Sequence, residues 1–363
     1  MNSGPRRRAA RALRVAITVD PLIPVPPILY GGIERVVDFL VRELLRRGHQ
    51  VTLFAHPDSR TDATLVPYGA PPHWGLRARS RELAQVGLGL LARRGALDVV
   101  HSFGRLAALL PVLPLRGLAK LQSYQRAEVP WRSVRTAVKF AGDSIRFTGC
   151  SASVFRDWAA GSGQWRAVFN GVEIAKYDAT PRVAPDAPLV FLGRLERIKG
   201  AHSAIAIARH AGRRLVIAGN RVIDRVEPDY FDREIAPFLE ADRVTYVGAL
   251  DDAQKNALLG QAAALLMPVE WEEPFGIVMA EALACGTPVI GFRRGSVPEV
   301  VREGVNGFAC ATVEEAARLV TAAAALDRTA IRRDCEVRFG DSAIADAYEA
   351  IYREMIAQVG GAR

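Results

Sequence analysis

The chain of 363 residues has little of what marks a metal-binding, disulfide-bonded or membrane-spanning protein. Its four cysteines are scattered, with no CxxC pair and no histidine at ligand spacing, so we expect neither a zinc site nor a disulfide framework. No apolar run approaches the roughly 20 residues that a membrane helix needs. The basic segment 1–12 lacks the apolar stretch of a secretory signal, which predicts a short disordered arm and a cytoplasmic protein.

Acidic residues are scarce in the first half of the chain. Residues 1–170 contain 25 lysine and arginine residues against 11 aspartate and glutamate residues, whereas residues 171–363 contain 23 against 28. This asymmetry predicts two surfaces with different partners. The basic half would meet an anionic ligand or the inner face of an anionic membrane, and a plain compositional bias toward arginine is the alternative.

What the sequence does contain is an alternation of strand and helix patterns. Short apolar runs predict strands at 13–19, 50–55, 98–101, 120–124, 147–151, 189–192, 214–218, 244–247, 264–268, 287–292 and 307–310. Helical periodicity predicts helices at 33–47, 154–160, 251–263, 277–284 and 341–358 and one that ends at 211, whereas 57–80 predicts an irregular loop. The alternation predicts an α/β protein with two doubly wound parallel sheets, in 13–170 and 171–340, followed by a C-terminal helical segment at 341–363.

Ligands of open parallel sheets bind beyond the carboxyl ends of the strands, and the distinctive residues of this chain lie in those loops. The loop residues that stand out are Gly31, Gly32, Gly193, Arg194, Lys199, Gly219, Asn220, Val247, Gly248 and the segment 273–276.

The strongest single pattern is EPFGIVMAE at 273–281. Gly276 removes a side chain where a helix begins, which leaves the backbone N–H groups of Gly276, Ile277 and Val278 free for an anion such as a diphosphate. Glu281 lies further along that helix, where its carboxylate can accept hydrogen bonds from ribose hydroxyls. Glu273 lies at the mouth of the loop, where it can hold a sugar hydroxyl or stabilise positive charge. Two ordinary glutamates, one in a helix and one at the surface, are the alternative.

Two cations accompany these glutamates. Arg194 and Lys199 are five residues apart in GRLERIKG, in another loop at the same edge of the predicted sheet. Together they would place positive charge beside a pyrophosphate leaving group, which gives electrostatic catalysis without a metal. A solvated cluster of charges is the alternative.

Taken together, these segments resemble the retaining glycosyltransferases of family 4, which have the two-domain GT-B fold. The resemblance rests on GGIERVV and RRGHQVTLF, then on FNGVE, FLGRLERIKG, LVIAGN and VTYVGAL, and finally on EPFGIVMAEALACGTPVIG with GSVPEVV. It spans about residues 13–320. It implies two Rossmann-like domains that face a central cleft, the first binding the acceptor and the second the nucleotide-sugar, with the C-terminal helix packed back on the first.

The resemblance also implies roles for the matching positions. Arg194 and Lys199 would bind the donor diphosphate, Glu281 the ribose and Glu273 the transferred sugar. Backbone contacts to the donor would come from Gly31, Gly32, Phe275, Gly276, Ile277 and Val278 at the sugar and diphosphate, and from Gly219, Asn220, Val247 and Gly248 around the base. Transfer in this family proceeds with retention on one face of the sugar, and it needs no protein nucleophile, cofactor or bound metal.

One residue expected from the resemblance is missing. Family members carry a histidine near the reacting sugar, but the matching segment here is KLQSYQRAE. Gln122, Gln125 and Arg126 are the candidates for sugar or acceptor contacts in that segment. His101 either faces the cleft or is an ordinary histidine at the end of a strand, and Tyr30 either shapes the acceptor site or covers the sheet.

We therefore expect a hexosyltransferase that uses a UDP- or GDP-sugar and an acceptor that is anionic or associated with the membrane, with no nucleic acid as partner. A sugar-nucleotide epimerase, a phosphorylase or a non-catalytic sugar-nucleotide-binding protein on the same fold are the alternatives. An epimerase would need further acid–base carboxylates and histidines, and a phosphorylase would need a pyridoxal-phosphate lysine, for which the few lysines offer no candidate. The missing histidine motivates the non-catalytic alternative.

Overall fold

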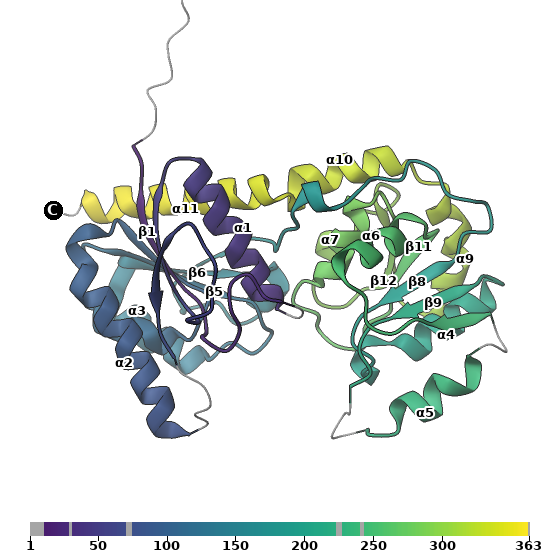
Figure 1. Ribbon diagram of the computed structural model, residues 1–363, viewed down its shortest axis with the longest axis horizontal. Helices are drawn as coiled ribbons and strands as arrows, with labels where there is room; N and C mark the ends of the chain where they lie inside the picture. The colour runs from purple at the N-terminus through teal and green to yellow at the C-terminus, as the bar shows by residue number, and fades with distance from the viewer. Residues whose placement is uncertain (1–10, 29–30, 70–74, 223–226, 240–242, 362–363) are drawn as a thin grey trace, which may run out of the picture.

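The structure is a computed structural model that describes residues 11–28, 31–69, 75–222, 227–239 and 243–361. Two parallel β-sheets with their covering helices form two lobes, which the C-terminal helices span along one side (Figure 1). The expectation of two doubly wound α/β units is confirmed. Most of the predicted arm at 1–12, and Tyr30, lie outside the described residues.

The first sheet has the strand order β3-β2-β1-β4-β5-β6-β7 with all neighbours parallel. Its strands are β1 (Arg14–Thr18), β2 (Gln50–Ala55), β3 (Thr64–Pro67), β4 (Val99–Ser102), β5 (Ala119–Tyr124), β6 (Ile145–Gly149) and β7 (Gln164–Ala167). The helices between them are α1 (Gly32–Arg46), α2 (Leu76–Arg93) and α3 (Trp131–Ala141), with 3-10 segments η1 (Arg94–Ala96), η2 (Leu106–Val112), η3 (Gly142–Ser144) and η4 (Ala152–Val154). Strands β4 and β5 are almost completely buried, as expected in the middle of a parallel sheet covered on both faces.

The second sheet has the order β10-β9-β8-β11-β12-β13, again all parallel. Its strands are β8 (Leu189–Leu192), β9 (Leu215–Ala218), β10 (Val244–Tyr246), β11 (Ala264–Met267), β12 (Val289–Phe292) and β13 (Gly307–Cys310). The helical elements are η5 (Ile174–Lys176), η6 (Arg197–Lys199), α4 (Ala201–His210), α5 (Tyr230–Glu234), η7 (Ala236–Phe238), α6 (Asp252–Gly260), α7 (Ile277–Ala284), α8 (Val297–Val300), α9 (Val313–Ala324), α10 (Arg328–Phe339) and α11 (Asp341–Gly360). In both sheets the strand order reverses beside the first strand, at β1/β4 and at β8/β11, which is where ligands bind in such folds.

Two predictions for the first lobe were wrong. The supposed irregular segment 57–80 contains the edge strand β3 and the first turn of α2, because pairing with β2 turns a short and weakly patterned run into a strand. The predicted helix at 154–160 does not form. The backbone leaves the helical region at Phe155, whose φ is −136°, and the Phe155 ring stacks on Trp165 with centroids 5.2 Å apart. Tertiary packing thus overrides the local helical pattern.

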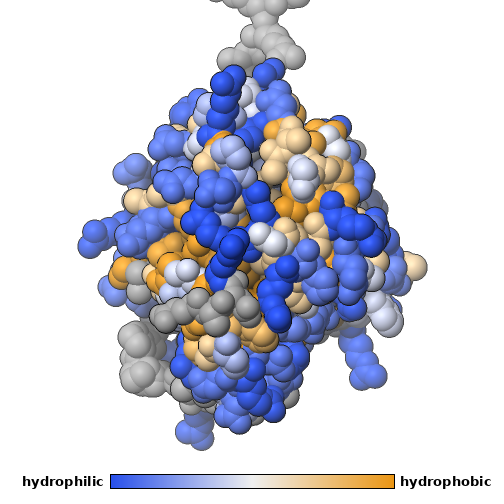
Figure 2. All heavy atoms as spheres, turned by 90° about the vertical axis from the view of Figure 1, so that its right-hand side faces the viewer, coloured by the Kyte–Doolittle hydropathy of each residue, from blue (hydrophilic) through white to orange (hydrophobic). Residues whose placement is uncertain are grey.

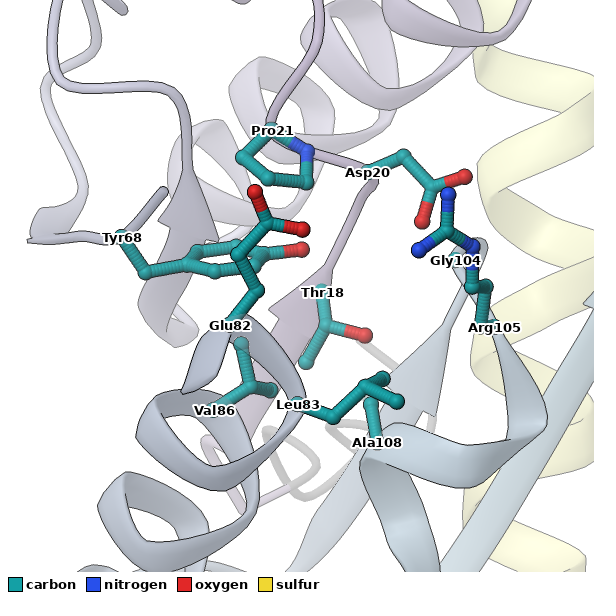
Figure 3. Close-up of a pocket in the computed structure, with 10 residues that line it drawn as sticks. All are labelled: Thr18, Asp20, Pro21, Tyr68, Glu82, Leu83, Val86, Gly104, Arg105 and Ala108. Carbon is teal, nitrogen blue, oxygen red and sulfur yellow. The ribbon is translucent and has the colours of Figure 1, made fainter. Parts of the chain in front are cut away.

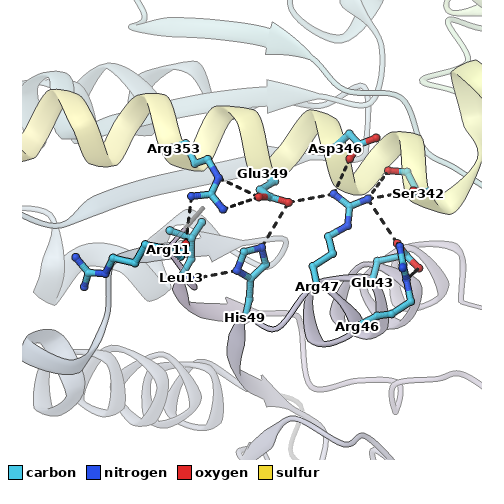
Figure 4. A network of polar contacts seen from close by, with 10 residues as sticks. All are labelled: Arg11, Leu13, Glu43, Arg46, Arg47, His49, Ser342, Asp346, Glu349 and Arg353. Carbon is cyan, nitrogen blue, oxygen red and sulfur yellow. Dashed lines mark hydrogen bonds and ion pairs between the residues drawn. The ribbon is translucent and has the colours of Figure 1, made fainter. Parts of the chain in front are cut away.

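The long helix α11 packs against the first lobe (Figure 1). Its polar face meets the end of α1, where Arg47 Nη1 lies 2.6 Å from Asp346 Oδ1 and 3.1 Å from Glu349 Oε2 (Figure 4). Arg353 pairs with the same Glu349 carboxylate at 2.7 Å. Its apolar face buries Tyr348 and Tyr352 completely in the core of the first lobe.

The chain crosses between the lobes twice, near residue 171 and near residue 340, and the two crossings are hydrogen-bonded to each other. The Val172 N–H donates to Phe339 O at 2.9 Å, and the Asp341 N–H donates to Val172 O at 3.1 Å. The two chain segments that join the lobes therefore lie side by side.

The outer end of the second lobe is largely hydrophilic, with apolar side chains lying between charged ones (Figure 2). No helix in the described part of the chain is both long and apolar enough to cross a membrane.

Candidate functional site

Two loops of the second lobe meet at the point where its strand order reverses. One follows β8 and includes Arg194 and Lys199, and the other follows β11 and includes Glu273. Because β8 and β11 are adjacent parallel strands, both loops emerge at the same edge of the sheet. The neighbouring loop after β9 contains Gly219, whose φ of +141° favours glycine and where a Cβ would lie only 1.8 Å from Gly193 O. The strand ends therefore approach one another closely.

Glu273 is held at the centre of this edge. Its side chain is 9% exposed, and its Oε2 lies 2.6 Å from Lys199 Nζ. Trp271 Nε1 donates to the same oxygen at 3.0 Å, and Lys199 Nζ stands 4.6 Å from the centroid of the Trp271 ring. Lys199 and Glu273 are thus brought together as predicted from the sequence, whereas the sequence analysis did not identify Trp271 as their partner.

Helix α7 begins four residues after Glu273, and its N-terminal end lies at the same edge of the sheet. Gly276 precedes the helix with a φ of +70° and no side chain caps the helix, so the N–H groups of Gly276, Ile277 and Val278 are the ones that a helix leaves unpaired at its start. Phe275 points the other way: its ring is buried 5.8 Å from the Phe339 ring. The loop therefore presents backbone to the site and anchors itself through its aromatic side chain.

Glu281 is the second carboxylate of this site, lies within α7 and is 5% exposed. Its Oε1 accepts hydrogen bonds from Tyr177 Oη at 2.8 Å and from Lys255 Nζ at 2.7 Å. Burial tends to lower the pKa of Lys255, but the adjacent Glu281 charge and its hydrogen bond outweigh burial and raise that pKa. Burial and the Glu281 charge both raise the pKa of Tyr177. Around Glu281 the lysine is therefore held charged and the tyrosine neutral.

Arg194 lies partly exposed at the edge of the site. Its side chain is 42% exposed, and its Nη1 lies 3.1 Å from Glu196 Oε1, so it is not part of the Lys199–Glu273 pair. A long cation that is anchored only at the rim remains free to turn toward a bound anion.

The loops after β9 and β10 border the site through their backbone. Gly219 N–H donates to Gly248 O at 2.8 Å, and Val247 N–H donates to Ile217 O at 3.0 Å. Asn220 O accepts from the Leu195 N–H at 3.0 Å. The four predicted base-side residues, Gly219, Asn220, Val247 and Gly248, are thus contiguous with the loop after β8.

The first lobe faces this site through the start of α1. A Cβ placed on Gly32 would lie 3.0 Å from Ile277 Cδ1 at the start of α7, so the predicted Gly31–Gly32 segment does lie beside the open end of α7. Three residues further on, Arg35 Nη1 lies 2.7 Å from Asp252 Oδ2 of the second lobe. A second contact joins the lobes where the Glu299 carboxylate accepts hydrogen bonds from the Ala152 and Ser153 N–H groups at 2.7 and 2.8 Å.

The structure does not bring His101 or Gln122 to the cleft. His101 is fully buried in β4, with Nδ1 2.6 Å from Tyr352 Oη and Nε2 2.6 Å from Ser123 Oγ, and burial holds its pKa well below the usual range. Gln122 is also fully buried and donates to Gly104 O at 2.9 Å. Of the two interpretations of His101, the ordinary structural histidine fits its position, because α11 covers it.

Gln125 and Arg126 do line an open site in the first lobe. A groove of about 610 Å³ lies at the carboxyl ends of β1, β4 and β5, between η2 and α3. Both amide atoms of Gln125 and the hydroxyl of Tyr124 are buried without a hydrogen-bond partner among the described residues, although such groups nearly always have one. Arg126 is exposed at the rim and makes no ion pair with the described carboxylates.

The groove combines apolar walls with charged rims. Its apolar lining includes Leu106, Leu110 and Phe103, and Leu110 is 57% exposed. Asp20 and Arg105 also line it, and their side chains point toward each other at the carboxyl end of β1 (Figure 3). A ligand here would need an apolar part as well as polar or charged groups.

Within the described chain, no group of three or more histidine, cysteine, aspartate or glutamate side chains is arranged to hold a metal ion. The four cysteines are free and buried. The charges of the site are those of its own lysine, arginine and glutamate side chains.

Trp271, Tyr177 and Lys255 were not predicted from the sequence, although each contacts Glu273 or Glu281. Trp271 and its neighbour Glu272 were visible as part of the loop, but nothing in the loop indicates that the indole N–H reaches Glu273. Lys255 lies 26 residues before Glu281 in another helix, and no local spacing connects the two. Only their placement on α6 and α7 reveals the contact.

Comparison with known proteins agrees with this geometry. The profile of the glycosyl transferases group 1 matches residues 178–335, and that of glycosyltransferase family 4 matches residues 30–137. The chain is 27% identical over 360 residues to glycogen synthase of Mycobacterium tuberculosis, covering 83% of this chain and 84% of that protein. It is 28% identical over 351 residues to D-inositol 3-phosphate glycosyltransferase of Mycolicibacterium smegmatis, covering 84% and 79%.

A solved structure shows the same arrangement. The crystal structure of AviGT4, a glycosyltransferase involved in avilamycin A biosynthesis, matches with a TM-score of 0.71 and 27% identity over 95% of this chain and 98% of that one. The two profiles, the full-length relatives and the shared two-lobed fold agree with one another. The chain belongs to the family 4 glycosyltransferases with the GT-B fold, and it is an enzyme that transfers sugars.

Proposed function

We propose that this enzyme is a retaining glycosyltransferase that moves a sugar from a nucleotide-diphosphate-sugar to an acceptor hydroxyl without a bound metal ion. The observation that carries the proposal is the convergence of Lys199, Glu273 and the uncapped start of α7 at one edge of the second sheet. Glu281 lies about one helical turn further along α7. This is the order in which diphosphate and ribose follow one another in a nucleotide-sugar.

In the proposed complex, the diphosphate lies against the N–H groups of Gly276, Ile277 and Val278, where the helix dipole favours an anion. Lys199 would stand between this diphosphate and Glu273, which already holds its ammonium group at 2.6 Å. Arg194 would turn from the rim to the same phosphates. These cations would offset the charge that grows on the leaving group, a task that metal ions perform in other enzymes.

The transfer itself would take place on one face of the sugar. The acceptor oxygen bonds to C1 as the bond from C1 to the diphosphate oxygen breaks, and the electron pair of that bond leaves with the diphosphate. The proton of the acceptor hydroxyl passes to the departing phosphate. Glu273 would stabilise the positive charge at C1 or hold a sugar hydroxyl, and no covalent sugar–enzyme intermediate is formed.

The acceptor would bind in the groove of the first lobe. The unpartnered Gln125 amide and Tyr124 hydroxyl supply hydrogen bonds there, and Arg126 at the rim supplies positive charge for an anionic group. The name of the Mycolicibacterium relative specifies a phosphorylated acceptor, which is the same class of ligand. We expect UDP or GDP as the nucleotide, and a thermal-shift panel of nucleotides tests this expectation.

A thermal-shift panel of UDP, GDP, ADP and TDP and their glucose, galactose, mannose and N-acetylglucosamine conjugates would test the proposal. Because a ligand that binds only the folded state stabilises it by about 2.7 kcal/mol at 100 times its Kd, the correct nucleotide should raise the melting temperature measurably. Slow hydrolysis of the matching nucleotide-sugar in the absence of acceptor, with retention seen by NMR, would support the proposal. Interconversion of the sugar, or tight binding without any turnover, would contradict it.

A further inference from the structure

Four alternating charges connect the Glu281 carboxylate with the first lobe. Lys255 Nζ lies 2.7 Å from Glu281 Oε1 and 3.0 Å from Asp252 Oδ1. The other oxygen of Asp252 lies 2.7 Å from Arg35 Nη1 on α1. Negative and positive charges therefore alternate from Glu281 on α7, through Lys255 and Asp252 on α6, to Arg35 on α1. The row of charges joins the second lobe to the first.

Lys255 and Tyr177 both bind one oxygen of Glu281 and leave the other available. The two hydrogen bonds end on Oε1, at 2.7 and 2.8 Å, and no described group donates to Oε2. Glu281 is nevertheless not sealed, since 7% of its side chain remains accessible. The hydrogen bonds to Oε1 fix the orientation of the carboxylate, and its Oε2 can accept a hydrogen bond from a ligand.

Lys255 is placed differently from a lysine that only joins two helices. Its side chain is 15% exposed and lies between two carboxylates, one of which is bound from the other lobe. Helix α6 is also held by the segment that follows α7, where Thr287 Oγ1 donates to Leu259 O at 2.6 Å. Removal of the ammonium group would leave Glu281 and Asp252 as two neighbouring carboxylates with no cation between them.

We propose that Lys255 is a positioning residue for the nucleotide ribose, and that Asp252 and Arg35 couple ribose binding to the approach of the two lobes. The proposal rests on the proposed function, in which Glu281 binds the ribose. With the lobes together, Arg35 offsets the charge of Asp252. The Lys255 ammonium group then interacts strongly with Glu281. With the lobes apart, Asp252 loses Arg35 and competes for Lys255, which loosens Glu281. Ribose binding and lobe closure therefore favour each other, as thermodynamic linkage requires.

The experiment compares ribonucleotides with their deoxy forms. UDP, GDP and ADP and the 2′-deoxy and 3′-deoxy counterpart of each are titrated by calorimetry into the wild-type chain and into Lys255→Met. A hydrogen bond from a ribose hydroxyl to a buried carboxylate predicts that the wild type binds the ribo form at least about tenfold more tightly than one of the deoxy forms. In Lys255→Met this preference should fall to within about threefold, because Glu281 is no longer held in place.

Matched variants separate positioning from simple stability. Lys176 forms an i,i+3 ion pair with Glu173 at 2.5 Å, as Lys255 does with Asp252, but it has no contact with Glu281; Lys176→Met should keep the wild-type preference. Lys255→Arg keeps the charge and should keep a part of the preference, which makes the test usable if Lys255→Met does not fold. If Lys255→Met weakens ribo and deoxy forms equally, the lysine is only structural and the proposal is overturned.

The coupling to the first lobe has its own test. Arg35→Gln should lower the ribose preference about threefold in the wild-type background and have no further effect when combined with Lys255→Met. Equal effects in both backgrounds would overturn the coupling. If the wild type binds none of the nucleotides, the proposed function is wrong. If the wild type transfers sugar but shows no preference for the ribo forms, the proposed function holds and the proposed role of Lys255 is wrong.

Discussion

The two lobes share one architecture, but they differ in how closely their candidate residues are connected. In the second lobe, Lys199, Glu273 and Trp271 touch one another, and Glu281 has its own partners in Lys255 and Tyr177. In the first lobe, the candidates from one segment are divided between the core and a groove whose polar groups have no hydrogen-bond partner among the described residues.

This difference has a physical basis. The diphosphate recurs in all nucleotide-diphosphate-sugars, and its neighbouring pentose varies little, so a donor site can be prearranged from few residues and backbone N–H groups. Acceptors differ from enzyme to enzyme, and their site lies on loops and short helices whose positions vary. Under the proposed function, the donor side would therefore be prearranged, whereas the groove of the first lobe would be completed by a particular acceptor.

The largest effect should come from the loss of the Lys199 ammonium group. Lys199→Ala should lower kcat about 10²- to 10³-fold with little change in the affinity for nucleotide diphosphate, because the charge is needed most as the leaving group forms. Steady-state kinetics with the donor found by the panel would measure this. Lys139→Ala, on the exposed face of α3, is the control. An equally large loss of kcat in both variants would refute a specific role of Lys199 at the leaving group.

The next effect concerns the ribose end of the donor site. Glu281→Ala should weaken nucleotide binding about 10- to 100-fold, since it removes a charged acceptor and leaves Lys255 and Tyr177 without it. Isothermal calorimetry with the free nucleotide is the measurement, and Glu314→Ala on the outer surface of α9 is the control. An unchanged affinity would refute the assignment of Glu281 to the ribose.

A smaller effect is expected on the acceptor side. Arg126→Gln should raise the KM for an anionic acceptor about fivefold and leave slow donor hydrolysis unchanged, because one exposed charge contact of about 1 kcal/mol is lost. Arg318→Gln, exposed on α9, should change neither quantity. If Arg126→Gln impaired donor hydrolysis instead, the division of labour between the lobes would be wrong.

The smallest effect concerns the attachment of α11 to the first lobe. Burial would raise the pKa of Glu349, but hydrogen bonds from Arg353 and Arg47, together with the nearby His49 ring, outweigh it and lower that pKa to about 2. A carboxyl group with a depressed pKa stabilises the fold above its unfolded value of about 4.3, and this contribution is lost as the pH falls toward 2.

Denaturant unfolding of Glu349→Gln and the wild type at several pH values would measure that contribution. The variant should be less stable at pH 7, and the difference should shrink between about pH 4.3 and pH 2. Asp346→Asn is a useful control, because its side chain is 70% exposed and its pair with Arg47 is screened by water. A difference that does not depend on pH would refute the ionic role of Glu349.

Much of the fold could be predicted, because hydrophobic periodicity is a local property. The predicted limits of β2, β8, β13 and α7 agree with the structure residue for residue. Strand β3 and the start of α2 could not be predicted, since β3 has only four residues and depends on pairing with β2. The helix predicted at 154–160 failed because the Phe155 ring packs against Trp165.

The sequence by itself determined the two doubly wound sheets and the motifs of the donor loops. Strand and helix patterns depend on residues that are close together in the sequence. A loop that binds a diphosphate likewise needs glycines and charged residues at fixed positions. Only the tertiary structure decided which side chains meet: that His101 lies under α11, that Gln125 lines a groove, and that Lys255 joins Glu281 to Asp252 and Arg35. Such contacts join residues far apart in the chain, and their geometry follows from how helices and lobes pack rather than from any local spacing.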